Sequence, residues 1–211
     1  MMLVIVVWIV LPGPALFAFL IYSAIHFSGD WDDAGVILRL SGGVATVGAP
    51  TLFQTENVAM IFAYLAPEPA ANTAAILLAI AGAISLAVFA ASMISSPKSR
   101  TNAALEQGMI WITAASVAPL VYFIVYFCSL HSVRHFSDAF ASFDNRPQAL
   151  RVAALLSAVT VLAALIGFTA LQGSVPELLE QSILRIVFIG LAALTVPHMI
   201  LVDRFQRKSI D

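Results

Sequence analysis

Long runs of apolar residues dominate this sequence and limit the folds that it can adopt. Of its 211 residues, 61% are hydrophobic and 10% are charged, whereas ordinary soluble domains are about 45–50% apolar and about 25% charged. A helix needs about 20 predominantly apolar residues to cross the hydrocarbon core of a bilayer. Five runs meet this requirement and predict membrane-spanning helices, at residues 2 to 26, 72 to 95, 108 to 131, 150 to 171 and 182 to 202.

A sixth region, residues 35 to 65, is apolar but interrupted. The interrupting residues are Arg39, Gly42, Gly43, Gly48, Pro50 and Glu56. We expect two short helices or a re-entrant pair there, because irregular backbone at membrane depth is tolerated only where protein or a cavity covers it. The sequence therefore predicts an all-α polytopic membrane protein in which residues 1–211 form one integral-membrane domain, a single bundle of about six to seven transmembrane or re-entrant helices.

Charge and cysteine content exclude several classes of protein. A formal net charge of -2 offers no basic surface for nucleic acid. The single cysteine, Cys128, excludes an intrachain disulfide framework. No basic residue precedes Arg39, so the cationic region of a secretory signal peptide is missing and we expect no cleaved signal.

Two histidines one helical turn apart are the strongest candidates for metal ligands. His131 and His135 occur in YFCSLHSVRHF at the end of an apolar run, and residues at i and i+4 share one face of a helix. An ionisable side chain within a membrane span is costly and is by default a functional-site hypothesis. Neutral imidazole suits Fe, Zn, Cu and Ni. The alternative is an interfacial role, with each ring hydrogen-bonded to a carbonyl or a lipid headgroup.

The chain contains four histidines, each at or near the end of an apolar run: His26, His131, His135 and His198. For His198, which follows Pro197, both the interfacial role and the ligand role are open. A metal-bound histidine commonly donates its other ring N–H to a carbonyl or carboxylate, and Asp138 is a candidate for that partner. An ion pair between Asp138 and Arg134, its i,i+4 neighbour, is the simpler alternative.

Residue identity excludes three familiar metal or cofactor sites. A zinc-protease helix requires glutamate directly after its first histidine, where this chain has Ser132. Membrane di-iron hydroxylases use many more histidines than the four present here. A bis-histidine haem needs ligands from opposing helices, which neighbours on one helix face cannot supply. A mononuclear site fits the number of histidines.

Aromatic residues precede the histidine pair at helical spacing. Phe123, Phe127, His131 and His135 recur every four residues, and Tyr126 lies beside them. Such a wall suits a long apolar ligand, and the predicted lining residues are Phe123, Tyr126, Phe127 and Phe136. The alternative is ordinary membrane packing, because aromatic residues are common in membrane helices and tyrosine is enriched at interfaces.

Four segments together resemble one known family, the Brp/Blh membrane β-carotene 15,15'-dioxygenases. They are IYSAIHFSGDW, GGVATVGAPTLFQTENVAMIFAYL, APLVYFIVYFCSLHSVRHF and VFIGLAALTVPHMILVD. The resemblance implies a multi-pass enzyme of the bacterial inner membrane that uses Fe(2+) and O₂ to split the central double bond of β-carotene into two retinals, commonly for a rhodopsin. It also implies that His26, His131 and His135 are iron ligands, with His198 as a substitute ligand or a residue supporting one.

The chain departs from the family pattern in one respect. The family's remaining histidine lies in an N-terminal PHGxxD-type motif, and no PHG triplet occurs here. We expect either an N-terminally truncated fragment or a shortened homologue with three inherited ligands. The alternative to an enzyme is a non-catalytic carotenoid- or retinal-binding membrane protein, or an inactive remnant. A small transporter is less well supported, because the predicted spans carry no charge at their centres.

Overall fold

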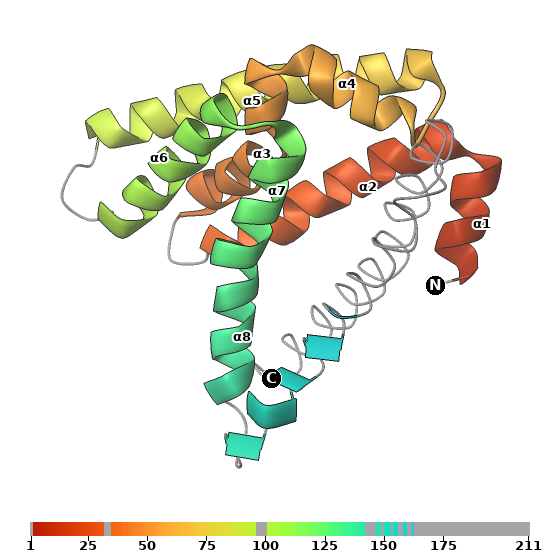
Figure 1. Ribbon diagram of the computed structural model, residues 1–211. Coiled ribbons are helices and arrows are strands. Elements are labelled where there is room, and N and C mark those ends of the chain that lie inside the picture. The colour runs from red at the N-terminus through yellow and green to blue at the C-terminus, as the bar shows by residue number, and fades with distance from the viewer. Residues whose placement is uncertain are drawn as a thin grey trace.

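The computed structural model describes residues 2–31, 35–95, 101–141 and scattered residues between 147 and 162. Within this part every regular element is helical (Figure 1), so the prediction of an all-α fold is confirmed there. The elements are α1 (Met2–Val10), α2 (Pro12–Phe27), the 3-10 helix η1 (Ser28–Trp31), α3 (Val36–Phe53), α4 (Thr55–Ala63), α5 (Glu68–Ser95), α6 (Thr101–Ser116), α7 (Pro119–Tyr126), the π-helix η2 (Phe127–His131) and α8 (Ser132–Ala141).

The first apolar run, residues 2 to 26, forms two helices, α1 and α2, and not one unbroken helix. Whether this run spans a membrane stays a prediction. Helix α1 ends before Leu11, whose backbone lies at φ -133° and ψ 62°. The cause is Pro12, because a proline ring clashes with helical backbone at the residue before it. The indole Nε1 of Trp8 donates a hydrogen bond of 3.1 Å to the carbonyl oxygen of Leu65 and holds α1 against the connection between α4 and α5.

The interrupted region forms two helices, α3 and α4, as one of the two alternatives predicted. They meet at Gln54, whose backbone leaves the helical region at φ -139° and ψ 51°. The side-chain amide of Gln54 donates hydrogen bonds to the carbonyl oxygens of Ala114, at 3.1 Å, and Val117, at 2.7 Å. These two carbonyls lie at the C-terminal end of α6, where the helix leaves such groups without partners. Gln54 therefore both ends α3 and fastens it to α6.

The run from 108 to 131 is also divided and does not form one unbroken helix. Its crossing of a membrane stays a prediction. Helix α6 ends at Ser116 and α7 begins at Pro119, with Ala118 extended at φ -58° and ψ 148°. Proline disfavours helical backbone at the preceding residue and is favoured at the first position of a helix. Beyond the break, α7, η2 and α8 continue as one rod (Figure 1).

Two helices of the described part, α3 and α5, are long and apolar enough to cross a membrane. The predicted span at 72 to 95 is confirmed as one continuous helix, α5. Of the apolar windows in these two helices, 56% is buried in α3 and 22% in α5, so α3 is the central helix. The predicted spans at 150 to 171 and 182 to 202 fall outside the described residues, apart from scattered helical positions up to 162. The number of spans stays a prediction.

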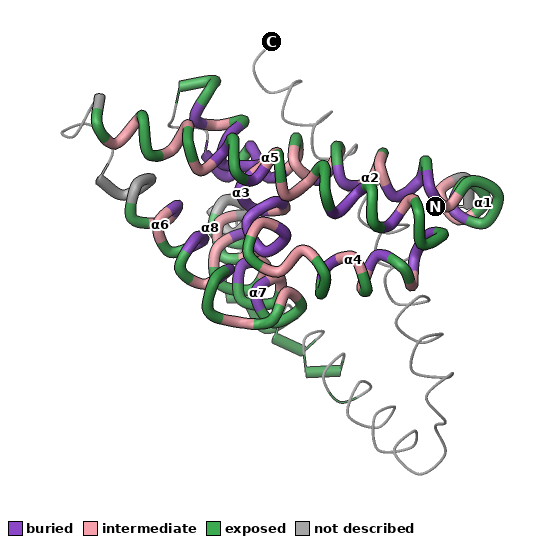
Figure 2. Tube along the Cα trace, turned by 90° about the horizontal axis from the view of Figure 1, so that it is seen from above, coloured by how far each residue is buried: buried purple, intermediate pink, exposed green. Residues whose placement is uncertain are grey.

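Close packing against α3 positions the segment that carries the site. A Cβ atom at Gly43 would lie 2.1 Å from the carbonyl oxygen of Ala24, and one at Gly42 would lie 2.5 Å from the Trp31 ring. Glycine at both positions therefore allows the end of α2 and the two ends of η1, Ser28 and Trp31, to lie directly on α3. Figure 2 shows buried residues concentrated along α3, among the surrounding helices.

Candidate metal and substrate site

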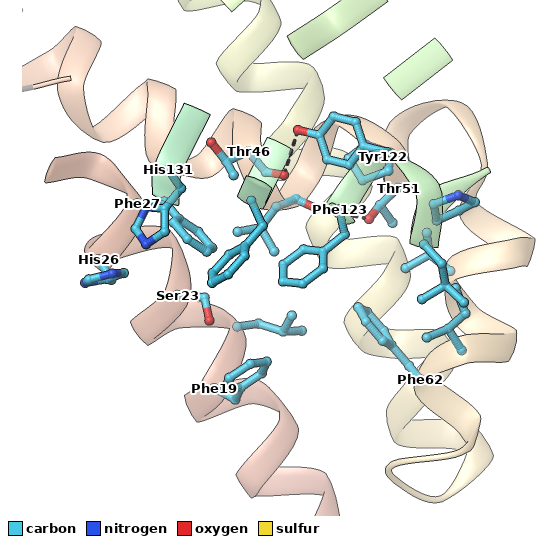
Figure 3. Close-up of a pocket in the computed structure, with 18 residues that line it drawn as sticks. Phe19, Ser23, His26, Phe27, Thr46, Thr51, Phe62, Tyr122, Phe123 and His131 are labelled. Carbon is cyan, nitrogen blue, oxygen red and sulfur yellow. Dashed lines mark hydrogen bonds between the residues drawn. The ribbon is translucent and has the colours of Figure 1, made fainter. Parts of the chain in front are cut away.

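Two of the predicted ligands meet in space although they are far apart in the sequence. His26 lies near the end of α2 and His131 is the last residue of η2. Their ring centroids are 5.2 Å apart and their planes are inclined at 70°. Figure 3 shows the two imidazoles at one end of a cavity.

A buried carboxylate lies behind His131. The Nδ1 atom of His131 is 3.0 Å from Oδ2 and 3.2 Å from Oδ1 of Asp30. His131 is 7% exposed and Asp30 is 9% exposed, so the contact is shielded from solvent. The phenol of Tyr126 donates a second hydrogen bond to the same carboxylate, at Oδ2. Because Nδ1 faces the carboxylate, a metal bound by His131 would be held through Nε2.

Asp30 was missed in the sequence analysis. It occurs in the segment IYSAIHFSGDW, four residues after His26, and charged residues make up only 10% of the chain. A carboxylate that closely follows a histidine at the end of an apolar run could have identified Asp30 as a candidate site residue. The sequence could not indicate, however, that Asp30 contacts His131, which lies 101 residues away in the chain.

The π-helix η2 brings two aromatic rings against His131. The rings of Phe127 and His131 are 5.3 Å apart, and those of Tyr126 and His131 are 6.4 Å apart. Phe123 stacks on Phe127 at 5.8 Å, so aromatic contacts lead along the rod to the imidazole. Phe27 of α2 adds an edge-to-face contact with His131 at 5.0 Å. The imidazole is therefore enclosed by aromatic rings on several sides.

Arg134 bridges the same region and has partners other than the one considered from sequence. Its guanidinium donates to the backbone carbonyl of Asp30 and to the carboxylate of Glu106 on α6. It also lies over the Trp31 ring at 5.6 Å. Asp138 belongs to α8, but its side chain lies outside the described residues.

The cavity beside the imidazoles has a volume of about 140 Å³ and an almost wholly apolar wall. Its lining comes from α2, α3, α4 and the rod formed by α7 and η2: Phe19, Leu20, Ser23, His26, Phe27, Thr46, Val47, Pro50, Thr51, Val58, Ile61, Phe62, Pro119, Leu120, Tyr122, Phe123, Phe127 and His131. In Figure 3 the histidines lie at one end and Phe62 lies toward the other. An elongated apolar molecule placed here would have one part close to the imidazoles.

The four predicted lining residues lie in different environments. Phe123 and Phe127 line the cavity. Tyr126 turns its hydroxyl to Asp30 and lines a neighbouring cavity with Glu106 and Arg134. Phe136 lies on α8 and is 47% exposed.

The remaining predicted ligands are described only in part. The backbone of His135 lies in α8, one helical turn beyond His131, and its side chain falls outside the described residues. His198 also falls outside them. Among the side chains that the structure does describe, no group of three or more His, Cys, Asp and Glu residues is arranged to hold a metal ion.

The residues that are described fit a histidine-bound metal. Metal–imidazole bonds of about 2.0–2.1 Å place two rings on one ion with centroids about 5 Å apart, and the rings of His26 and His131 are 5.2 Å apart. The carboxylate at Nδ1 of His131 is the partner that metal-bound histidines commonly have. Neutral imidazole suits iron among other transition metals.

Comparison with known proteins identifies the family of this chain. A family model described as "Beta-carotene 15,15'-dioxygenase" matches residues 1–206. A protein named beta-carotene 15,15'-dioxygenase from an uncultured marine bacterium, 66A03, is 33% identical over 207 residues, which cover 93% of this chain and 74% of that protein. No solved structure matches the chain. The chain therefore belongs to the β-carotene 15,15'-dioxygenase family.

Proposed function

We propose that this protein cleaves the central double bond of β-carotene with O₂ and releases two retinals. The observation that carries the proposal is the position of His26 and His131 at one end of an apolar, aromatic-lined cavity. The named activity of the relative that is 33% identical supports the same reaction. The reaction balances without a further oxidant or reductant, because one carbon–carbon double bond breaks and each new aldehyde carbonyl takes one atom of O₂.

The proposed metal is Fe(2+), held by His26, His131 and His135. His198 is a substitute ligand or a residue supporting one. When bound, iron would supply the activation of O₂. The imidazoles hold the coordination geometry, and the helix that carries His131 and His135 sets the position of two ligands at once.

The cavity would bind and orient the polyene. Aromatic and aliphatic walls from four segments exclude water and favour an extended apolar molecule. Positioning is the main contribution that a protein can make to regioselectivity, because the central bond differs from its neighbours mainly in its distance from the chain ends. Phe123 and Phe127, which line the cavity and lead to His131, are the residues best placed to hold the polyene beside the metal.

The exterior of the bundle supports a membrane location. Large apolar side chains of α5 are exposed along its length, including Ile76 at 55% and Ile84 at 60%. An apolar surface of this kind is unfavourable in water and suits lipid. We infer a multi-pass protein of the bacterial inner membrane, which β-carotene enters laterally from the lipid and which supplies retinal to a rhodopsin.

The test is retinal production in a bacterium that makes β-carotene. The chain as given and an upstream-extended form would be expressed separately, with retinal and residual β-carotene measured by chromatography. We expect retinal from the active form and none from its His131→Ala or His135→Ala variant, while Ser116→Ala, on the exposed end of α6, retains activity. Normal retinal from either histidine variant would overturn the metal assignment. Carotenoid that copurifies without cleavage in every form would indicate the non-catalytic binding protein instead.

A further inference from the structure

Three side chains from separate elements meet in a buried polar group beside the proposed metal site. Asp30 of η1 accepts from the Tyr126 hydroxyl of α7 and lies 3.0 Å from Nδ1 of His131 of η2. The side chains of His131 and Asp30 are 9% and 3% exposed. Burying a carboxylate is costly unless it is hydrogen-bonded. Here Tyr126 and His131 are such partners, and His131 is a proposed metal ligand.

The π-helix explains how Tyr126 and His131 reach the same carboxylate. In an α-helix, at about 100° per residue, side chains five positions apart point about 140° away from each other. In a π-helix the repeat is wider, with hydrogen bonds from i to i+5, so such side chains come close to alignment. The rings of Tyr126 and His131 do lie side by side, with centroids 6.4 Å apart, and both reach the Asp30 carboxylate. Single-turn π-helices of this kind occur frequently at functional sites.

Asp30 is also held through its backbone. Arg134, one turn beyond η2, donates to the carbonyl oxygen of Asp30 while its other nitrogen pairs with Glu106 of α6. The same 3-10 helix lies against Gly42 of α3, where a Cβ atom would collide with Trp31. Asp30 therefore has a fixed backbone position as well as a fixed carboxylate, which is what a residue that orients another side chain requires.

We propose that Asp30 is a positioning residue that holds His131 in the Nδ1-protonated tautomer and directs its Nε2 atom to the metal site, with Tyr126 fixing the carboxylate. The inference rests on the proposed metal site, but it adds residues outside the predicted ligand set. A hydrogen bond from Nδ1–H to a carboxylate fixes both the tautomer and the orientation of the ring, and it raises the basicity of the other nitrogen.

The test measures metal binding apart from catalysis. The full chain, purified in detergent and freed of metal by chelation, would be titrated with Co(II), whose visible spectrum reports the ligands around the ion. We expect Asp30→Ala to weaken Co(II) binding by about 10- to 100-fold and to change the spectrum. Asp30→Asn keeps a hydrogen-bond acceptor, so its Co(II) affinity and its spectrum should lie closer to those of the wild type. Tyr126→Phe, which removes one hydroxyl, should give a smaller loss in the same direction.

A matched control separates positioning from loss of a buried polar contact. Ser85→Ala removes a buried hydroxyl that donates to the Ser41 carbonyl oxygen and contacts the Ser41 hydroxyl, two contacts that join α5 to α3. It should lower the melting temperature and leave Co(II) affinity and spectrum unchanged. If Asp30→Ala fails to fold, Asp30→Asn and Tyr126→Phe decide the matter through the same titration.

The outcomes distinguish this inference from the proposed reaction. Wild-type affinity and spectrum in the Asp30 variants would overturn the positioning role, as would a wild-type chain that binds no Co(II). A wild-type chain that binds Co(II), shows the expected response to Asp30→Ala and yet produces no retinal when loaded with iron would overturn the reaction and leave the positioning role supported.

Discussion

The phenol of Tyr122 donates a hydrogen bond of 2.9 Å to the carbonyl oxygen of Thr46, and this contact joins α7 to α3. Both residues line the cavity (Figure 3), so the same bond fixes the distance between two of its walls. The rod that begins at α7 carries His131, which makes the bond part of the support of the site.

Removing the hydrogen bond between Tyr122 and Thr46 should destabilise the contact between α7 and α3 while the Tyr122 ring stays in the cavity wall. Tyr122 is 2% exposed, and Tyr122→Phe keeps the ring but leaves the Thr46 carbonyl without this donor. A net loss of about 1–2 kcal/mol in unfolding free energy is expected. Thermal unfolding in detergent would measure it, with Thr73→Val as the control because its hydroxyl bonds only at an exposed position on α5. Equal melting temperatures for Tyr122→Phe and wild type would contradict the prediction.

Glycine at the crossing of α3 and α5 should be required for close packing. A Cβ atom at Gly82 would lie 2.6 Å from the carbonyl oxygen of Gly48, which is backbone and cannot move aside cheaply. Gly82→Ala should therefore destabilise the protein by about 1–3 kcal/mol. Gly108→Ala is the matched control, because a Cβ there meets no neighbouring atom within 4 Å, and alanine favours a helix by about 1 kcal/mol over glycine. If the melting temperature moved in the same direction for Gly82→Ala and Gly108→Ala, the requirement for glycine where α3 crosses α5 would be contradicted.

Filling the cavity should impair carotenoid cleavage while sparing the metal. Ser23 is a small buried residue of α2 that faces the cavity between Phe19 and Phe27 (Figure 3). Ser23→Leu should lower kcat/KM for β-carotene by about tenfold or more, equivalent to about 1.4 kcal/mol. Iron content, measured by elemental analysis of the purified protein, should stay at the wild-type level. Ser116→Leu adds the same volume on the exposed face of α6 and should have no effect, whereas a wild-type rate in Ser23→Leu would place the substrate elsewhere.

Iron removal should abolish activity reversibly, since the proposed reaction depends on metal-activated O₂. Treatment of the purified protein with an Fe(II) chelator should stop retinal formation, and Fe(II) added back anaerobically before exposure to O₂ should restore it. Zn(II), which also binds imidazole but has no redox chemistry, should occupy the site without restoring activity. His26→Ala should retain little iron in the same preparation. Full activity after chelation would contradict the proposal.

Several features of the protein were accessible from local sequence patterns. Apolar runs predicted the helices, because a segment that must bury its backbone polar groups in lipid or in a core has few alternatives. His131 and His135, four residues apart, lie on one continuous helical rod, as their position in an apolar run predicted. The helix breaks at Pro12 and Pro119 could also have been predicted, because proline disfavours helical backbone at the residue directly before it.

Long-range contacts were not accessible in the same way. The contacts of Asp30 with His131 and Tyr126, and that of His26 with His131, depend on how α2 and η1 pack on α3 and on where the rod from α7 to α8 crosses them. Nothing local to FCSLH predicts a π-helix, because the wider turn depends on the packing around it. Helical propensity and hydropathy act within a few residues of the chain, whereas a buried carboxylate finds its partners only when separate helices have been packed together. The residues that form the site can therefore be named from the chain, but the contact between Asp30 and His131 that orients it exists only in the assembled bundle.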